Sequence, residues 1–318
     1  MAEPMTTALI HSPRFLEHDT GRGHPERPDR LRAIDRALHE HRLHDRLTPL
    51  DFHPAGDDAI ARIHARAYIH RLTEACHLGR PCIDSPDSAI CPVSEQVARL
   101  AVGGTLAAAD ALAAGDAQRA FCALRPPGHH AEADFSMGFC LYNNLAIAAA
   151  HLVAHHGLER VAIVDFDVHH GNGTQHSFDA RRDVLFASIH QHPDTLYPGT
   201  GHAHETGTGQ GEGYTVNVPL PPGAGDEPWL DAFRRHVRPR VIEHRPQMLL
   251  LSAGFDAHAD DPLANLNVTA DGFEQLTREL RDLADELCHG RILSVLEGGY
   301  NLTALADAVA RHVEVLAR

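Results

Sequence analysis

The stretch VAIVDFDVHHGNGTQHSF, residues 161–178, carries the main prediction of fold and function for this chain. Its first four residues form a largely β-branched apolar run, which is typical of a strand buried on both faces of a parallel sheet. If the chain stays extended beyond that run, the alternation of a strand places Asp165, Asp167 and His169 on one side. Two carboxylates and an imidazole would then lie within reach of one point, which is a metal-site spacing.

The alternative for this stretch is a strand followed by a polar turn whose histidines only fill space. An Asp-x-His pattern alone does not decide between the two. Three ligand-type residues at the carboxyl end of a buried strand favour the metal site, because open α/β sheets place their sites there. Gly171 and Gly173 would let the backbone turn close to that site.

Length and charge bound the classes of protein that this chain can be. Its 318 residues suit one α/β domain spanning 1–318, since such folds often run this long as one unit. The formal net charge of -15 disfavours nucleic acid as a partner and favours a cationic ligand, although it also serves ordinary solubility.

Cysteine usage and the amino terminus predict a reduced, cytoplasmic protein. The six cysteines form no CxxC pair and no dense framework, so neither a zinc finger nor a disulfide scaffold is indicated. The start MAEPMTTALIHSP lacks a basic-then-apolar signal pattern, and we expect no membrane-spanning helix because no uninterrupted apolar run approaches about 18 residues.

The rest of the chain alternates apolar strands with amphipathic or Ala-rich helices, which is the βαβ rhythm of a parallel sheet. Further strands are expected at 7–11, 119–124, 184–190, 214–220, 248–252 and 292–296. Helices are expected at 31–41, 58–77, 93–114, 144–155, 229–243 and 273–288.

Polar groups with catalytic chemistry follow several of these strands. His129 and His130 stand behind the Pro-Pro-Gly bend at 126–128, Asp256 follows the strand at 248–252, and Tyr300 follows the strand at 292–296. Each group alone has an ordinary structural explanation. Together they all fall at the carboxyl ends of strands, which predicts one site at that edge of the sheet.

Five ordered motifs carry a family resemblance: RPPGHHA (125–131), GFCLYNN (138–144), DFDVHHGNGTQ (165–175), SAGFDAHADDP (252–262) and LEGGYN (296–301). Over nearly the whole chain they resemble the zinc-dependent histone deacetylases and their bacterial relatives. The loop HPERP and the variant HHGNG look more like class II than class I. The resemblance implies the arginase–deacetylase fold, a single α/β domain with a central, mainly parallel sheet and helices on both faces.

The resemblance implies that Asp167, His169 and Asp256 bind one zinc ion per chain. Three protein ligands leave a position open for water and substrate, which distinguishes a catalytic zinc from a closed structural one. The ligand types alone would also admit iron(II), cobalt or manganese.

The resemblance assigns His130 as general base and then acid, and His129 as a mainly electrostatic partner. Asp165 would orient the first histidine and Asn172 the second, where many class I members carry aspartate. Because an amide does not hold imidazolium charge as a carboxylate does, the pKa of His130 should be raised less than with aspartate. Tyr300 would stabilise the developing oxyanion.

Substrate and ion contacts are also implied by the resemblance. Gly138, Phe139 and Tyr197 would border the channel for an acyl-lysine chain. A structural potassium ion would use, partly through backbone oxygens, Asp165, Asp167, His169, Ser188 and Ile189.

The predicted reaction is hydrolysis of the ε-amide of N-acetyl-lysine, in a peptide or protein, by metal-activated water. An acetylpolyamine or other small-molecule N-acyl amidohydrolase would share the mechanism, and a non-catalytic acyl-lysine-binding or acetoin-utilisation-type protein is a further alternative. Polyamine-selective relatives carry a glutamate where this chain has Leu263, which favours lysine. The loop acids Asp84 and Asp87 could draw a polyamine or hold the backbone of a peptide. Oligomeric state is not predicted.

Overall fold

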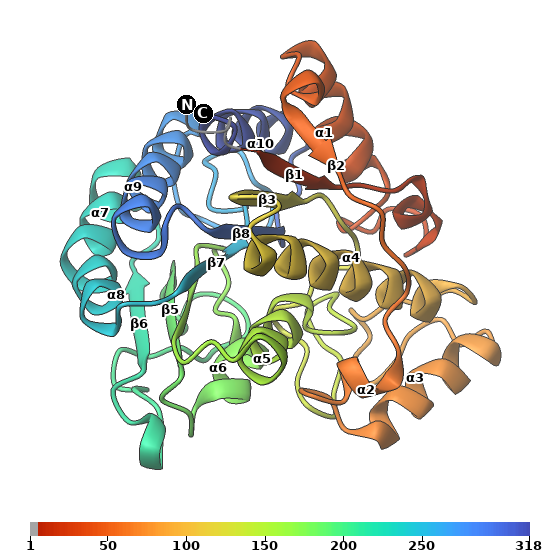
Figure 1. Ribbon diagram of the computed structural model, residues 1–318. Coiled ribbons are helices and arrows are strands. Elements are labelled where there is room, and N and C mark those ends of the chain that lie inside the picture. Colours follow the sequence, from red (N-terminus) through yellow and green to blue (C-terminus); the bar gives the residue numbers. More distant parts are fainter. Residues whose placement is uncertain (1–5) are drawn as a thin grey trace.

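One parallel sheet forms the centre of the computed structural model, which describes residues 6–318 (Figure 1). Residues 1–5 lie outside the described residues. They belong to the predicted domain and to the amino terminus that was expected to carry no signal peptide. Within the described part, the strands are β1 (Thr7–Ile10), β2 (Leu47–Pro49), β3 (Arg119–Cys122), β4 (Val161–Asp165), β5 (Val184–Gln191), β6 (Thr215–Leu220), β7 (Met248–Ala253) and β8 (Ile292–Leu296). All neighbouring pairs are parallel, in the order β2-β1-β3-β8-β7-β4-β5-β6.

Burial follows position in the sheet. Every residue of β3, β4, β5, β7 and β8 is buried, whereas the edge strands β2 and β6 are partly exposed. The central strands can be apolar throughout because helices cover both faces of the sheet. The structure thus has the α/β architecture that the apolar strands predict.

Helices lie on both sides of the sheet (Figure 1). On one side α4 packs against α5, and on the other α1, α10 and α9 pack in succession. The α-helices are α1 (Asp29–Glu40), α2 (Asp57–Ile60), α3 (Arg66–His77), α4 (Ser94–Ala114), α5 (Asn144–His156), α6 (Asn172–Phe178), α7 (Asp226–Ala232), α8 (Arg238–His244), α9 (Ala270–Cys288) and α10 (Leu302–Leu316). Short 3₁₀ segments are η1 (Pro13–Glu17), η2 (His44–Arg46) and η3 (Gly209–Gly211), and η4 (Phe233–Val237) is π-helical.

Helix α4 is the one described helix long and apolar enough to cross a membrane, judged by length and composition only. The sequence expectation, based on uninterrupted apolar runs, did not include this helix. In the structure α4 packs against α3, α5, β1 and β3, and 56% of its apolar window is buried inside the protein. This packing explains the composition, because a core helix of an α/β protein needs an apolar surface on several sides.

Two predicted helices are interrupted. The segment at 58–77 forms α2 and α3, because the backbone N–H of Ala65 donates to Ala133 O at 2.7 Å and the ring of His64 bonds Glu132 O and Asn143 N. The segment at 229–243 forms α7, η4 and α8. Pro239 lies in the first turn of α8 and has no N–H to donate, so a regular hydrogen-bond ladder cannot pass through it.

Two further helices were not predicted. Helix α10 begins at Leu302, and the side chain of Asn301 caps it by accepting from Thr303 N and Ala304 N at 3.1 Å. Helix α6 begins at Asn172, directly after Gly171, where the sequence predicted a sharp backbone turn and no helix.

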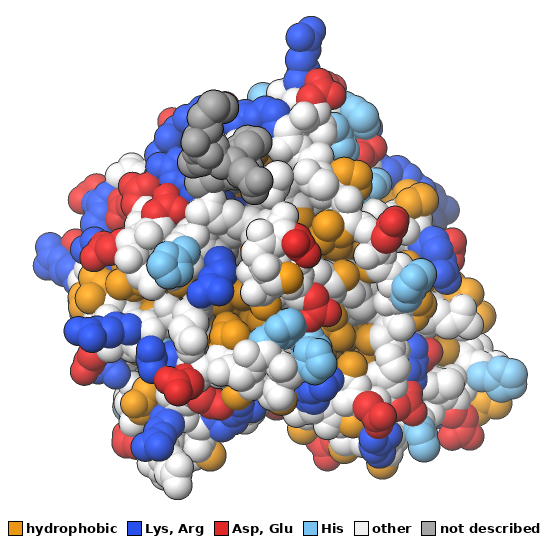
Figure 2. All heavy atoms as spheres, viewed as in Figure 1, with side chains coloured by type: hydrophobic (Ala, Val, Ile, Leu, Met, Phe, Trp, Pro, Cys, Tyr) orange, Lys and Arg blue, Asp and Glu red, His pale blue; other side chains and the backbone are white. Residues whose placement is uncertain are grey.

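Charged side chains are mixed on the face shown in Figure 2. Basic and acidic groups alternate over its surface and leave a partly hydrophobic centre between them. On this face the net negative charge of the chain is therefore not concentrated in one acidic field.

Candidate active site

The predicted site residues meet because their strands are neighbours. Strands β3, β8, β7 and β4 are consecutive in the sheet. Their carboxyl ends lead respectively to the histidine pair, Tyr300, Asp256 and the loop that holds Asp167. Since parallel strands end at the same edge, residues up to 171 positions apart in the chain converge there.

Asp167, His169 and Asp256 form a buried group whose ligand atoms all lie within 4.8 Å of one another. His169 Nδ1 lies 3.0 Å from Asp167 Oδ1 and 3.1 Å from Asp256 Oδ2. Backbone N–H groups hold both carboxylates: Gly298 N donates to Asp167 Oδ2 at 2.8 Å, and Val168 N donates to Asp256 Oδ1 at 2.9 Å. The three side chains are thus oriented toward one point.

The backbone reaches this point by a turn and not by the extended chain that was expected. Strand β4 ends at Asp165, whose Oδ1 accepts from Asp167 N at 3.1 Å, and Asp167 Oδ1 in turn accepts from His169 N at 2.9 Å. Such bonds from a side chain to the backbone two residues on stabilise tight turns. As a result Asp165 lies outside the three-residue group.

The electrostatics of the group favour a cation. Burial by itself lowers the pKa of His169, but hydrogen bonds and charges from Asp167 and Asp256 outweigh burial and raise that pKa to about 10. Two carboxylates that share one imidazole leave a net negative charge in a buried place. Glycine is required beside them, because a Cβ at Gly298 would lie 2.0 Å from Asp256 Oδ2.

The two adjacent histidines have different partners. His129 Nδ1 lies 3.0 Å from Asp165 Oδ2, and His130 Nδ1 lies 2.7 Å from Asn172 Oδ1. Burial lowers the pKa of His129, but the charges of Asp167 and Asp165 raise it to about 10. Burial, with the neighbouring His129 and His169, lowers the pKa of His130 well below its ordinary value. Their surroundings therefore favour a charged first histidine and a neutral second one.

Tyr300 is held from both sides. Its backbone N–H donates to Asp261 Oδ2 at 2.7 Å, and the guanidinium of Arg30 lies 5.0 Å from the centre of its ring. Arg30 Nε also donates to Gly299 O at 2.6 Å. The Gly-Gly-Tyr turn is thus fixed by a buried carboxylate and a buried arginine.

Comparison with known proteins bears on this arrangement. A model of the histone deacetylase domain matches residues 24–316. The chain belongs to the histone deacetylase family. It is 40% identical over 287 residues to a histone deacetylase-like amidohydrolase of Pseudomonas aeruginosa, covering 90% of this chain and 75% of that protein. It is also 40% identical over 300 residues to a protein of Archaeoglobus fulgidus named "Probable deacetylase", covering 94% of this chain and 82% of that protein.

A solved structure described as the HDA15 HD domain superposes with a TM-score of 0.92 at 38% sequence identity, covering 99% of this chain and 88% of that one. The likeness confirms both the family resemblance and the arginase–deacetylase fold. As a member of this family the protein is a hydrolase that acts on amides.

Glu132 is a site residue of this deacetylase that the sequence did not single out. Asn172 Nδ2 donates to Glu132 Oε1, and His176 Nδ1 lies 2.8 Å from the same oxygen. A carboxylate only accepts, so the nitrogen of the Asn172 amide faces Glu132 and its oxygen faces His130. Glu132 therefore sets which way that amide points.

A buried charge cluster supports the loops on either side of the site. The carboxylate of Glu26 pairs with Arg125 and lies 3.2 Å from Arg30 Nη1, and all three side chains are fully buried. Arg125 directly precedes the bend before the histidine pair. Nearby, Glu297 Oε2 accepts from the backbone N–H of Gly128 at 2.7 Å. Both glutamates lie in motifs that carry the family resemblance, HPERP and LEGGYN, but only the fold shows what they bind.

Aromatic rings lie beside the site, and their role in bordering an acyl-lysine channel stays a prediction. The ring of Phe139 lies 5.7 Å from that of Tyr300 and 4.8 Å from that of His24, and Tyr197 lies 5.2 Å from His130, measured between centroids. Gly138 has φ +56, and a Cβ there would lie 2.2 Å from His130 Cδ2, so only glycine fits.

The loop acids have partners within the protein. Asp84 Oδ2 lies 3.0 Å from Arg71 Nη2 and accepts from Ser136 N at 2.9 Å, while Asp87 Oδ2 accepts from Gly138 N at 3.1 Å. In this conformation they stabilise the loop beside the site, and a contact with substrate stays a prediction.

The remaining predicted residues lie close to the same edge of the sheet. Leu263 is half-buried, and its backbone N–H donates to Asp261 Oδ1 at 3.0 Å. Asp165 and Ser188 are paired across β4 and β5, and Ile189 follows on β5.

Proposed function

We propose that this protein is a zinc-dependent deacetylase that hydrolyses the ε-amide of N-acetyl-lysine in peptides or proteins. The observation that carries the proposal is the buried Asp167, His169 and Asp256 group beside a histidine pair with unlike partners. That combination offers a cation site and a proton-transfer group at one edge of the sheet.

The donor set fits zinc. Bonds of about 2.0–2.1 Å in a tetrahedral site place neighbouring ligand atoms about 3.3 Å apart. The two nitrogen-to-oxygen separations here are 3.0 and 3.1 Å, so binding needs only a small expansion. When bound, zinc would polarise the acyl carbonyl and make water a better nucleophile.

His130 is the residue best placed to move the proton. Because Asn172 presents its oxygen, His130 Nδ1 carries the hydrogen of that bond, and Nε2 keeps a free lone pair. A neutral imidazole can accept a proton from water and then deliver it to the leaving amine. His129, paired with Asp165, supplies positive charge beside the reacting atoms.

Tyr300 would donate its hydroxyl to the acyl oxygen as negative charge develops there. Asp261 and Arg30 hold the turn that carries it, so the hydroxyl needs little reorganisation during reaction. Phe139 and Tyr197 would flank the methylene chain of the acyl-lysine, which is apolar up to the amide. We further propose that potassium binds near Asp165 and Ser188 and keeps β4 and β5 in register.

Leu263 supports lysine over a polyamine, because a half-buried leucine cannot pair with a distal ammonium. The test compares kcat/KM for an acetyl-lysine peptide with that for acetylspermidine and acetylputrescine. Acetate release reports the turnover of all three substrates, because each of them loses the same acetyl group.

We expect the peptide to have the higher kcat/KM, and Leu263→Glu to move the ratio toward polyamines. Leu78→Glu is the matched control, because it adds the same charge at a surface side chain that is 57% exposed. A wild-type preference for acetylpolyamines of about tenfold, equal to about 1.4 kcal/mol, would overturn the lysine assignment in favour of the polyamine alternative.

A further inference from the structure

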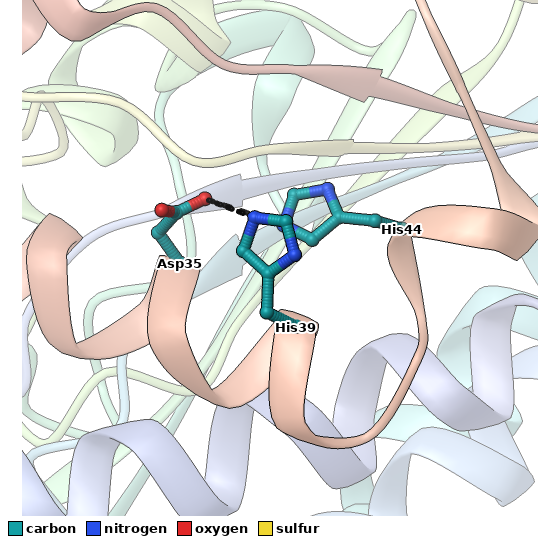
Figure 3. Close-up of side chains that lie close together, drawn as sticks. All are labelled: Asp35, His39 and His44. Atoms are coloured by element: carbon teal, nitrogen blue, oxygen red, sulfur yellow. Dashed lines mark ion pairs between the residues drawn. The ribbon is translucent and has the colours of Figure 1, made fainter.

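A second group of metal-ligand side chains lies outside the active site, where β1, α1 and η2 meet. Asp35 and His39 are four residues apart on α1 and therefore share one face of that helix. His44 returns to them from η2, as Figure 3 shows. His11 approaches the same carboxylate from the residue after β1.

All three imidazoles face one oxygen. From Asp35 Oδ1, Nε2 of His44 lies at 3.2 Å, and Nε2 of His39 and of His11 each lie at 3.9 Å. The rings of His39 and His44 lie with centroids 4.0 Å apart (Figure 3). The two longer separations exceed hydrogen-bond distance, so hydrogen bonds to Asp35 do not explain why the histidines gather here.

His44 Nε2 is the clearest sign of a missing partner. That atom is buried and makes no hydrogen bond to any described residue, although it points toward Asp35. A buried polar atom without a partner is costly, and a metal ion would supply one.

A similar group elsewhere shows the contrast. His151 Nε2 and His156 Nε2 lie 2.6 and 2.7 Å from Asp110 Oδ1, which are ordinary hydrogen-bond distances. Those atoms are already satisfied and are closer together than ligands around zinc. The separations around Asp35, at 3.2–3.9 Å, bracket the spacing of about 3.3 Å that zinc requires.

We propose that Asp35, His39 and His44, whose ligand atoms all lie within 4.8 Å of one another, form a second metal site that takes a zinc-like divalent ion, with His11 beside it. Two imidazoles and one carboxylate supply three protein ligands, and water would complete the four-coordination that zinc prefers. Nitrogen-rich ligands select zinc, nickel or copper over magnesium and calcium. The ion would tie α1 to η2, beside the end of β1.

The test is zinc content after equilibrium dialysis at submicromolar free zinc. Wild-type protein should hold two equivalents, Asp35→Asn/His44→Ala one, and Asp256→Ala one. His41→Ala is the matched control, because His41 is an exposed histidine at the end of α1 outside the cluster, and it should keep two. Zinc should raise the unfolding temperature of Asp256→Ala, and adding His39→Ala should abolish that rise.

One equivalent in wild-type protein, or two in Asp35→Asn/His44→Ala, would overturn the second site. If His151→Ala/His156→Ala lost the second ion and the Asp35 variant kept it, the ion would bind at the Asp110 cluster. That result would also refute the proposal. These outcomes are separate from failure of the active-site assignment, in which Asp256→Ala would keep the same zinc content as wild type.

Discussion

Replacing Glu26 by glutamine should destabilise the protein strongly, because it removes the carboxylate that pairs with two buried arginines, Arg125 and Arg30. Burial raises the pKa of Glu26, but the charges and hydrogen bonds of Arg125 and Arg30 outweigh burial and lower that pKa from 4.5 to about 2. A shift of this size corresponds to about 3 kcal/mol of folding free energy. Breaking a buried ion pair by removing one partner costs about 3–5 kcal/mol, which agrees.

The sign of the pH dependence follows from the lowered pKa. A carboxyl group with a depressed folded-state pKa stabilises the protein fully above its unfolded pKa of 4.5, and that contribution is lost as the pH falls toward about 2. The difference between wild type and Glu26→Gln should therefore be constant near neutrality and shrink to about 2 kcal/mol at pH 3.5.

Urea unfolding followed by the fluorescence of Trp229, the single tryptophan, measures this difference. Glu40→Gln is the control, because Glu40 is exposed on α1. If Glu26→Gln were as stable as Glu40→Gln, or if its deficit did not change between pH 7 and pH 3.5, the reasoning about this cluster would be refuted.

Further predictions concern the catalytic groups. Tyr300→Phe should keep its zinc and fold but lower kcat about 10²–10³-fold, and a kcat within twofold of wild type would exclude the hydroxyl from the transition state. His130→Ala should lower kcat more than His129→Ala at equal zinc content, and the reverse order would exchange their roles. Glu132→Gln should lower kcat with little change in KM and move the acid limb of the pH–rate profile to lower pH, since it removes negative charge behind Asn172; an unmoved profile would make Glu132 merely structural.

The edge of the sheet where the site lies could be predicted from sequence because local patterns define it. The apolar runs before Asp165, Asp256 and Tyr300 mark buried strands, and parallel strands end together. The neighbour relations could not be predicted from these patterns. The order β3-β8-β7-β4 makes the strands that precede His129 and Tyr300 neighbours, although the two residues are far apart in the chain.

The supporting residues escaped prediction for a physical reason. Glu26, Glu132 and Asp261 are common residue types whose roles depend on partners brought near by tertiary packing, such as Arg125 for Glu26. Burial changes what such a carboxylate does, and burial of a single polar residue is not visible in a local pattern.

Helix ends and breaks likewise differ in whether the local sequence predicts them. The end of α4 at Gly115 was predictable, since a left-handed residue with φ 86 favours glycine. The break between α2 and α3 was not, because His64 turns inward to bond the backbone at Glu132 and Asn143, contacts that span up to 79 residues.

The most direct test of the central claim is acetate release from an acetyl-lysine peptide by chelated protein before and after zinc is restored, in wild type and in Asp256→Ala. Wild-type protein should lose activity on chelation and regain it with zinc. Asp256→Ala should stay inactive in zinc, because two of the three active-site ligands do not hold the ion in place. Full activity in metal-free wild-type protein, or wild-type turnover by Asp256→Ala, would contradict the assignment of this site as the catalytic zinc centre.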